Sequence, residues 1–570
     1  MCGFIACFGN AEVVSSNLVA HRGPDQSYFR QAQEFSIEFN RLSVTGGPAG
    51  EIPVWSVGGR WEVFLNGEIY NFRDLIRKWG IRHTASDTQV LADGLEKFGI
   101  KALKDLRGMF AGIARDNSLG ASFVFRDPLG EKPAFWSSFR GGIQVASEAT
   151  ALVGLDKGEF ALDAEAANEF FRFGYVEEPK TIYSGVQAVG RGAVWRIDLP
   201  NQRLVRWETL QGFGDDEIEA SLPDLLDTII REQVTIGVRS AVALSGGVDS
   251  AALTFGLKKN TSAGNRLVSI SVNLPDMPNK SEYRQAKKTS ILLGVKNYRV
   301  DVTANDLKST FEELGARSDQ PIGDLAALNY LKIFEKVAKL GLKVVYLGHG
   351  PDEFFWGYPS IVHELENSIR EGVESKYGNN TYWNLQGFVR SEVQTKAPMV
   401  RSLRDFGSED PMLLSRDPFR RARAFLSHSY LAHNGFAQSD RLAMSFGIEP
   451  RTPFGDARLY GWAQSNQVSN EEGAFDKAQF RRAIPPIVRS LIGNRAKRPF
   501  FSHLSKSRFI LENPGGAPPL VDFQDLLDIP AIAETLETLS DRSRLQSFAF
   551  FSHWLSGRRS RGLTWDGSIR

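Results

Sequence analysis

Two groups of residues in this sequence have the types and spacing that chemistry requires. The first is Cys2, directly after the initiator methionine. We expect removal of Met1, which would leave a free α-amino group beside the Cys2 thiol. With a pKa near ~8, such an amine can act as the base for its own side chain. The second is the segment 245–250 (SGGVDS), which follows the short apolar run 240–244. The first group predicts a nucleophile and the second an anion-binding loop.

The segment 245–250 predicts a strand, a glycine-rich turn and a helix. This geometry gathers backbone N–H groups at a helix N-terminus, where anionic oxygens bind. Gly246 and Gly247 let a phosphate approach the chain closely. Ser245 and Ser250 add hydroxyl groups, and Asp249 can hold Mg²⁺. Because the lysine of a Walker loop is missing, we expect pyrophosphate binding rather than γ-phosphoryl transfer. The alternative is a glycine-rich turn without a ligand.

Composition limits the class of protein. The chain has 570 residues, enough for two or three domains, with 42% hydrophobic and 24% charged residues. A net charge of +1 gives no bias toward nucleic acid. No apolar stretch reaches the ~18 residues of a membrane span, and the N-terminus lacks signal-peptide features. The two cysteines, Cys2 and Cys7, cannot build a disulfide framework. We therefore expect a cytoplasmic protein that binds neither nucleic acid nor membranes.

The second half of the chain alternates predicted strands and helices. Apolar runs at 240–244, 267–272 and 298–302 predict strands, and the spacing over 282–293 predicts a helix. This order is typical of a parallel sheet with helices on both faces. Ligands of such sheets bind at the carboxyl ends of the strands, where the segment 245–250 would lie.

Several short motifs carry a family resemblance. In the first half these are 21–25 (HRGPD), 41–43 (RLS), 65–71 (LNGEIYN), 86–87 (SD) before a helix, and 126–133 (RDPLGEKP). Together they resemble the class II glutamine amidotransferase domain of the asparagine synthetase family. In the second half, 245–250 resembles the PP-loop of ATP pyrophosphatases. The segments 439–444, 448–454 and 494–500 resemble further motifs of the same family.

The resemblance implies an α/β protein with two domains. The expected order is an N-terminal-nucleophile αββα sandwich over 1–195, a linker over 196–222, and a parallel-sheet PP-loop domain over 223–570 that adenylates an acceptor. The segment 505–570 has helical spacing from Leu536 to Trp554 but no chemistry that we can identify. Relatives are often dimers, so a homodimer is left open.

In the first domain the resemblance implies hydrolysis of glutamine. Attack by Cys2 on the amide develops an oxyanion, which the Asn66 side chain and the Gly67 N–H would stabilise. Arg41 would pair with the substrate carboxylate and Asp87 with its ammonium group. The implied glutamine-binding residues are Arg41, Leu42, Ser43, Asn66, Gly67, Glu68 and Asp87.

In the second domain the resemblance implies ATP and Mg²⁺. The implied ATP- and pyrophosphate-binding residues are Leu244, Ser245, Gly246, Gly247, Asp249, Ser250, Val272, Leu347, Gly348 and Asp352. Asp249 and Asp352 would hold the metal. Lys497 would stabilise charge on the adenylate and on the departing groups.

Two positions depart from the family pattern. His349 stands where asparagine synthetases carry a glutamate that contacts the amino group of aspartate. An imidazole cannot replace a carboxylate as the partner of an ammonium group. Gln320 replaces one acid of the turn 319–324. The predicted function is therefore glutamine-dependent amidation of a small carboxylic acid, with release of AMP and pyrophosphate. Aspartate is the family default, and a dedicated synthetase for another carboxylate is the alternative.

Three other functions are associated with parts of this sequence pattern. A sugar or phosphoribosyl amidotransferase would share the first domain, but the segment 245–250 and Asp352 argue against it. A β-lactam-synthetase-like cyclase does not need a nucleophilic Cys2. A noncatalytic scaffold would have lost several site residues at once. The two domains together also imply an ammonia tunnel between the sites, although no sequence feature shows one directly.

Overall fold

The computed structural model describes most of the chain. It covers residues 1–9, 16–32, 34–44, 52–81, 86–139, 141–156, 158–210, 220–235, 237–261, 267–279, 281–358, 415, 417–466, 477–492 and 541–569. In that part of the chain, no helix is long and apolar enough to cross a membrane.

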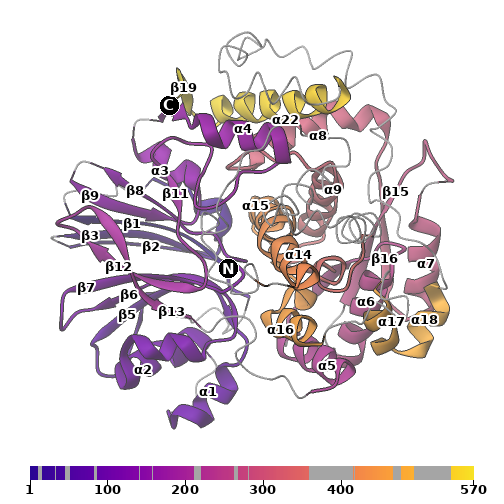
Figure 1. The fold of residues 1–570 in the computed structure, drawn as a ribbon, viewed down its shortest axis with the longest axis horizontal. Helices are drawn as coiled ribbons and strands as arrows, with labels where there is room; N and C mark the ends of the chain where they lie inside the picture. Colours follow the sequence, from indigo (N-terminus) through magenta and orange to yellow (C-terminus); the bar gives the residue numbers. More distant parts are fainter. Residues whose placement is uncertain are drawn as a thin grey trace.

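The N-terminal domain is a sandwich of two six-stranded sheets (Figure 1). The first sheet has the order β11 (Gln187–Ala188), β8 (Phe135–Phe139), β9 (Gly142–Ala146), β1 (Cys2–Gly9), β3 (Phe35–Arg41), β2 (Gln26–Ala32). The second has the order β13 (Arg203–Thr209), β12 (Ala193–Asp198), β7 (Ala121–Arg126), β6 (Gly108–Asp116), β5 (Trp61–Ile69), β4 (Val54–Trp55). Four helices complete the layers, α1 (Phe72–Trp79), α2 (Asp87–Phe98), α3 (Ala149–Leu155) and α4 (Ala164–Phe173).

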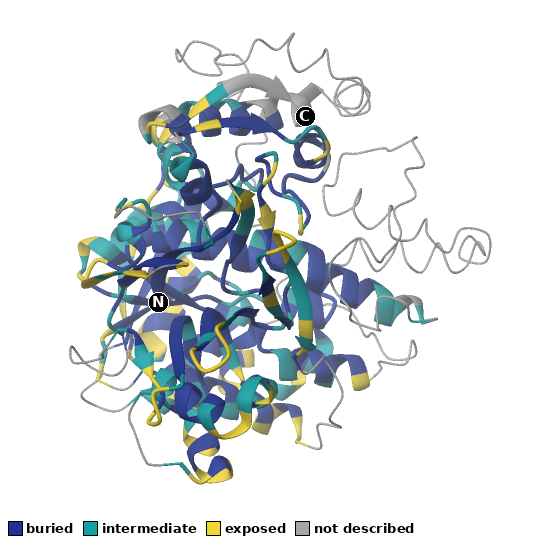
Figure 2. Ribbon diagram, turned by 90° about the vertical axis from the view of Figure 1, so that its left-hand side faces the viewer, coloured by how far each residue is buried: buried dark blue, intermediate teal, exposed yellow. Residues whose placement is uncertain are grey.

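Alternation along β1 explains the layering. Phe4 and Phe8 pack between the two sheets, whereas Ile5 and Cys7 pack with the helical side of the first sheet. This is the period of two that a strand buried on both faces requires. The expected αββα sandwich is confirmed, and Figure 2 shows its strands largely buried.

The sandwich extends beyond the expected boundary at residue 195. β12 crosses that position, and β13 pairs with it out to Thr209. β13 is a half-exposed edge strand with polar residues, so its sequence has the composition of a linker. The predicted linker 196–222 is therefore wrong in its first part.

The C-terminal domain contains a five-stranded parallel sheet, as predicted. Its order is β16 (Lys296–Asp301), β15 (Leu267–Asn273), β14 (Ser240–Ala243), β17 (Val344–Tyr346), β18 (Glu449–Arg451). The helices before residue 360 are α5 (Leu222–Gln233), α6 (Val248–Asn260), α7 (Tyr283–Leu292), α8 (Leu307–Arg317), α9 (Ala326–Lys339) and α10 (Pro351–Phe354). Later come α14 (Pro418–Leu426), a π-helix (Ser427–Ala437), α15 (Gln438–Met444), α16 (Ala457–Ser465), α17 (Ala478–Ala483) and α18 (Pro486–Ile492).

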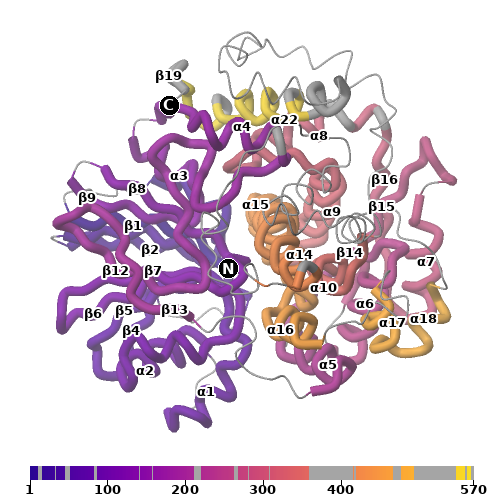
Figure 3. Tube along the Cα trace, in the orientation of Figure 1, coloured from indigo at the N-terminus to yellow at the C-terminus, as the bar shows by residue number. Residues whose placement is uncertain are grey.

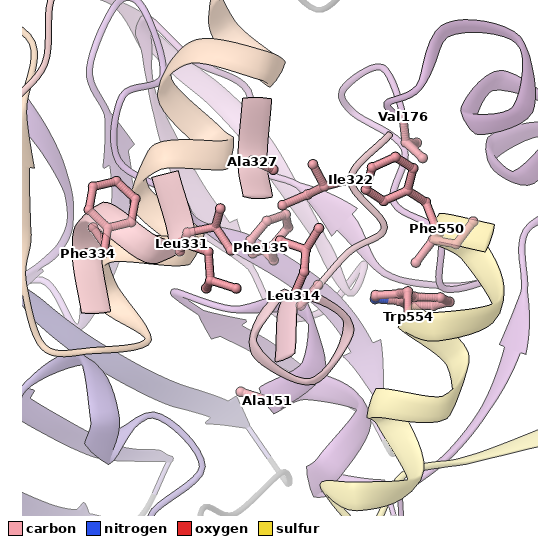
Figure 4. Packing of buried hydrophobic residues seen from close by; sticks show 14 of the residues in the cluster. Phe135, Ala151, Val176, Leu314, Ile322, Ala327, Leu331, Phe334, Phe550 and Trp554 are labelled. Atoms are coloured by element: carbon pink, nitrogen blue, oxygen red, sulfur yellow. The ribbon is translucent and has the colours of Figure 1, made fainter. Parts of the chain in front are cut away.

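The C-terminal segment joins the two domains. α22 (Asp541–Ser560) packs on α8 and α4, and β19 (Thr564–Ile569) pairs in parallel with β10 (Glu159–Leu162) of the N-terminal half. Figure 4 shows Trp554 and Phe550 of α22 close to Leu314 and Ile322, in a core that also contains Phe135. The segment therefore does not belong to the second domain alone, as the division at 223–570 had assumed.

Candidate active sites

The predicted nucleophile lies where the two domains meet. Cys2 begins β1 and is 6% exposed, and Figure 3 places the N-terminus between the two halves of the molecule. Its backbone N–H donates to Asn66 Oδ1 at 2.9 Å. Burial raises the pKa of the Cys2 thiol, while the N-terminal ammonium, the Leu42 backbone and Arg41 act in the opposite direction. Desolvation is the larger effect, and Glu449 adds to it, so the buried thiol is harder to ionise than a free one.

Asn66 has the geometry expected of an oxyanion donor. Its side chain is fully buried, and its Nδ2 makes no hydrogen bond to any residue that the structure describes. An amide donor left in this way is costly unless a ligand uses it. Gly67 follows with φ +142°, and a Cβ there would lie 2.0 Å from the Met109 carbonyl oxygen. Only glycine fits this backbone beside the donor.

The predicted glutamine-binding residues surround the same point. Arg41 pairs in register with Cys2 across β1 and β3. The Leu42 N–H donates to the Met1 carbonyl at 2.7 Å, and the Ser43 N–H donates to Asp25 Oδ2 at 2.7 Å. Asp87 opens α2, and its carboxylate accepts the Ile69 N–H at 2.9 Å, at the end of the strand that carries Asn66 and Gly67. The structure therefore brings the predicted residues together, and their roles toward glutamine stay predictions.

Glu68 differs from the expectation. Its carboxylate, expected to orient glutamine, forms an ion pair with Arg451 of β18. Arg451 also bonds Glu449 at 2.6 Å, and Glu449 Oε2 lies 3.3 Å from the Met1 ammonium nitrogen. Burial raises the pKa of Glu68 to about 7, with Arg451 acting against that shift. The C-terminal domain thus places the charged side chains of Glu449 and Arg451 beside the predicted glutamine site. The motif at 448–454 did not predict this contact between the domains.

A second buried contact crosses the same interface. Arg22 Nε donates to the Cys2 carbonyl at 3.3 Å, and its terminal nitrogen bonds Asp440 Oδ2 at 2.7 Å. Lys132 Nζ lies 3.3 Å from the other oxygen of Asp440. All three charged side chains are at most 2% exposed. The backbone of Cys2 is therefore linked through Arg22 to α15 of the other domain.

The glycine-rich loop lies at the carboxyl end of β14, as predicted. The Ser245 N–H donates to Ser250 Oγ at 3.1 Å, and the Gly247 N–H donates to Ser245 Oγ at 3.1 Å. These bonds hold a turn whose next residue, Val248, begins α6. A Cβ at Gly348, in the loop after β17, would lie 3.3 Å from the Ser250 nitrogen. Two strand ends therefore meet at the helix N-terminus, where phosphates bind.

The remaining predicted nucleotide residues occupy the same edge of the sheet. Leu244 and Leu347 follow the neighbouring strands β14 and β17, and both are buried. Val272 lies near the end of β15, on the other side of β14. Gly246 has no room for a Cβ, which would lie 2.9 Å from Glu282 Cβ.

The two acids predicted to hold Mg²⁺ converge on one point. Lys477 Nζ lies 2.5 Å from Asp249 Oδ2 and 2.7 Å from Asp352 Oδ1. Although burial disfavours its ammonium form, the two carboxylates raise the pKa of Lys477. The donor set fits Mg²⁺, since two carboxylates carry more negative charge than one lysine balances and oxygen is the ligand that Mg²⁺ prefers. No motif of the sequence pointed to Lys477.

The residues predicted to lie near the acceptor are only partly within the described part of the chain. His349 is half-buried, with Nε2 3.1 Å from Ser439 Oγ and its ring centroid 5.4 Å from that of Tyr330. Gln320 instead lies in the domain interface, where its Oε1 accepts the Ile182 N–H at 3.1 Å. Its departure from the family pattern therefore says nothing about the acceptor. Lys497 lies outside the described residues.

Comparison with known proteins defines the class. A family model described as a glutamine amidotransferase domain matches residues 1–208. The asparagine synthase family model matches residues 221–556, more than half of the chain. The chain belongs to the asparagine synthase family, and it is a glutamine-hydrolysing ligase.

Individual relatives are distant. A putative glutamine-hydrolysing asparagine synthetase of Mycobacterium bovis is 27% identical, covering 95% of this chain and 92% of that protein. Amidase chyE of Penicillium rubens is 26% identical, covering 85% of this chain and 84% of that protein. A solved glutamine phosphoribosylpyrophosphate amidotransferase from B. subtilis is 14% identical over 61% of this chain and 82% of that one, with a TM-score of 0.28, too low to compare folds.

Proposed function

We propose that the enzyme adenylates a carboxylic acid other than aspartate and converts it into an amide with ammonia released from glutamine at Cys2. The observation that carries the choice of acceptor is His349, which stands at the end of β17 beside the nucleotide loop. Ser439 and Tyr330, which both contact its ring, are neutral.

The charges around His349 disfavour an acceptor that carries an α-ammonium group. A substrate ammonium group that enters a buried site without a carboxylate partner costs several kcal/mol. Three acids lie near Tyr330, and each already has a partner. Glu353 is 4% exposed and accepts the Tyr358 hydroxyl at 2.5 Å, Asp352 pairs with Lys477, and Asp324 accepts the Ala326 N–H at 2.9 Å. An acceptor without an α-ammonium group avoids this cost. His349 can then donate to an acceptor oxygen, or accept a proton.

The chemistry balances in two steps. An acceptor carboxylate oxygen attacks the α-phosphorus of ATP, and the bond to pyrophosphate breaks. Ammonia then attacks the acyl carbon of the adenylate, AMP leaves, and a proton is lost from nitrogen. Asp249 and Asp352 would hold Mg²⁺, which supplies charge neutralisation for the phosphates. The turn 245–250 binds the departing pyrophosphate through its N–H and hydroxyl groups.

Ammonia needs a path that keeps it unprotonated. One continuous apolar cluster contains Met1 and Leu42 beside Cys2, and also Leu431 and Phe436 of the π-helix near His349. Because such an interface excludes water, it supports transfer of neutral ammonia between the sites. The passage itself is part of the proposal.

The names of the relatives are compatible with two classes of acceptor. Those named asparagine synthetases favour aspartate, which is the second candidate. The proteins named amidases, chyE and chry2 of Gibberella zeae, show that relatives of comparable identity carry other names, which fits a different acceptor.

The test measures AMP and pyrophosphate release with ammonia supplied. The panel should pair aspartate with succinate and other carboxylic acids that lack the α-ammonium group. We expect weak turnover of aspartate, improved in His349→Glu, and higher turnover of at least one acid without that group. A matched control is His349→Gln, which replaces the ring at the same position without adding a carboxylate. Aspartate as the best acceptor of the wild type, unaffected by His349→Glu, would refute the proposal.

A further inference from the structure

Lys477 occupies an unusual position between the two predicted metal-binding acids. It precedes α17, it is 2% exposed, and its φ of +60° lies in the left-handed region that non-glycine residues rarely adopt. Its Nζ contacts Asp249 at 2.5 Å and Asp352 at 2.7 Å. A lysine held in a disfavoured backbone conformation at a ligand site points to a functional constraint.

The neighbouring backbone is shaped to admit this side chain. A Cβ at Gly357 would lie 2.6 Å from Lys477 Cε and 1.9 Å from Asp352 Oδ1. The Gly357 N–H also donates to the Asp352 carbonyl at 2.8 Å, which fixes the turn. Any residue other than glycine would therefore displace either the lysine or the acid. The Asp249–Lys477–Asp352 contact depends on three separate segments of the chain.

The chemistry of the loop leaves a role for such a cation. The segment 245–250 has no lysine, so its turn offers pyrophosphate only neutral N–H and hydroxyl donors. Pyrophosphate is highly anionic, and phosphate sites normally combine such donors with a positive side chain. Among the described residues, Lys477 is the cation in contact with both acids that flank this turn.

We propose that Lys477 is the pyrophosphate-binding cation of the synthetase site and shares the two carboxylates with the metal by exchange. In the free protein its ammonium stands between Asp249 and Asp352. With Mg²⁺ and ATP present, Asp249 and Asp352 would hold the metal, and the Lys477 ammonium, repelled by the like charge, would pair with the pyrophosphate part of the nucleotide. This inference rests on the proposed ATP-dependent function, but it does not depend on the identity of the acceptor.

Exchange predicts opposite changes in two affinities when the lysine is removed. In Lys477→Met, Mg²⁺ no longer has to displace an ammonium group, so Mg²⁺ alone should bind more tightly. Pyrophosphate, measured with Mg²⁺ present, should bind more weakly because its cation is lost. We expect each dissociation constant to change by about tenfold or more.

The experiment uses the full-length protein without acceptor or glutamine. Mg²⁺ alone is titrated by its effect on the melting temperature, and Mg²⁺-pyrophosphate binding is titrated by calorimetry. Arg482→Met on the same helix, whose side chain is exposed, is the matched control and should change neither value. If Lys477→Met does not fold, Lys477→Gln, whose amide can still donate to a carboxylate, tests the same pair of changes.

The possible results distinguish exchange of Lys477 with the metal from a structural role of Lys477 and from failure of the adenylation function. Tighter Mg²⁺ binding together with weaker pyrophosphate binding supports the exchange. Unchanged affinities overturn both parts of the proposal and leave Lys477 as a structural ion-pair partner. Weaker pyrophosphate binding without tighter Mg²⁺ binding overturns the exchange with the metal. Wild-type protein that binds no pyrophosphate at all would instead refute the adenylation function.

Discussion

Asp440 is the residue whose replacement tests the interface most directly. Its two oxygens contact Arg22 at 2.7 Å and Lys132 at 3.3 Å, and it is 1% exposed. Asp440→Asn preserves the shape but removes the negative charge. Breaking a buried pair in this way typically costs ~3–5 kcal/mol, because a buried cation loses its partner. Since Glu148 still lies 3.4 Å from Arg22, we expect the lower end, about 3 kcal/mol.

The same change should act unequally on the two activities. Arg22 donates to the Cys2 carbonyl, so a displaced arginine alters the position of the nucleophile against Asn66. A loss of about tenfold in glutamine-dependent synthesis is a modest estimate for such a shift. Synthesis from added ammonia does not use Cys2 and should fall much less.

The assay compares chemical denaturation and both activities with a matched variant. Asp74→Asn removes an acid that is 49% exposed and pairs with Arg77 and Arg107 on the surface. Surface pairs of this kind contribute less than about 1 kcal/mol. Equal stability of the Asp440 and Asp74 variants, or equal losses of the two activities in Asp440→Asn, would refute the assignment.

Three further predictions follow from single residues. Cys2→Ala should abolish glutamine hydrolysis and leave ammonia-supported synthesis, measured by glutamate and amide formation; equal loss of both would make Cys2 structural. Asp249→Asn or Asp352→Asn should eliminate AMP release with either nitrogen source, and near-normal release would contradict the metal assignment. Glu178 is half-buried, and desolvation alone would raise its pKa, but two arginines lower the pKa to about 2. Its ionised carboxylate contributes about 3 kcal/mol to the free energy of unfolding. This contribution is fully present above pH ~4.5, which is its pKa in the unfolded chain, and is lost as the pH falls through about 2. In Glu178→Gln the free energy of unfolding, measured by acid unfolding, should therefore depend less on pH in that range.

The residues that carry local signals could be predicted from the sequence. The glycines and serines of the segment 245–250, together with the apolar strand before it, predict a turn. The structure places this turn at the end of β14. Asn66 and Gly67 were found by a motif, and the buried Nδ2 and positive φ give the physical reason for those residue types.

Long-range partners could not be predicted in this way. Arg451 and Glu68 lie 383 residues apart and have no periodic pattern that would pair them. Lys477 precedes a helix of ordinary basic composition, and only the fold brings it between Asp249 and Asp352. The boundary at 195 failed for the opposite reason, since the edge strand β13 has a polar sequence that imitates a linker.

The first active site is therefore not complete within the domain that carries its nucleophile. Asp440 and Arg451 belong to the second domain, yet they pair with Arg22 and Glu68 of the first. In a fragment that ended near residue 210, Arg22 and Glu68 would lose these partners. Ser439, next to Asp440, meanwhile contacts His349 at the acceptor side. Two consecutive residues of α15 thus reach both sites, so a change that repositions this helix cannot alter one site and leave the other untouched.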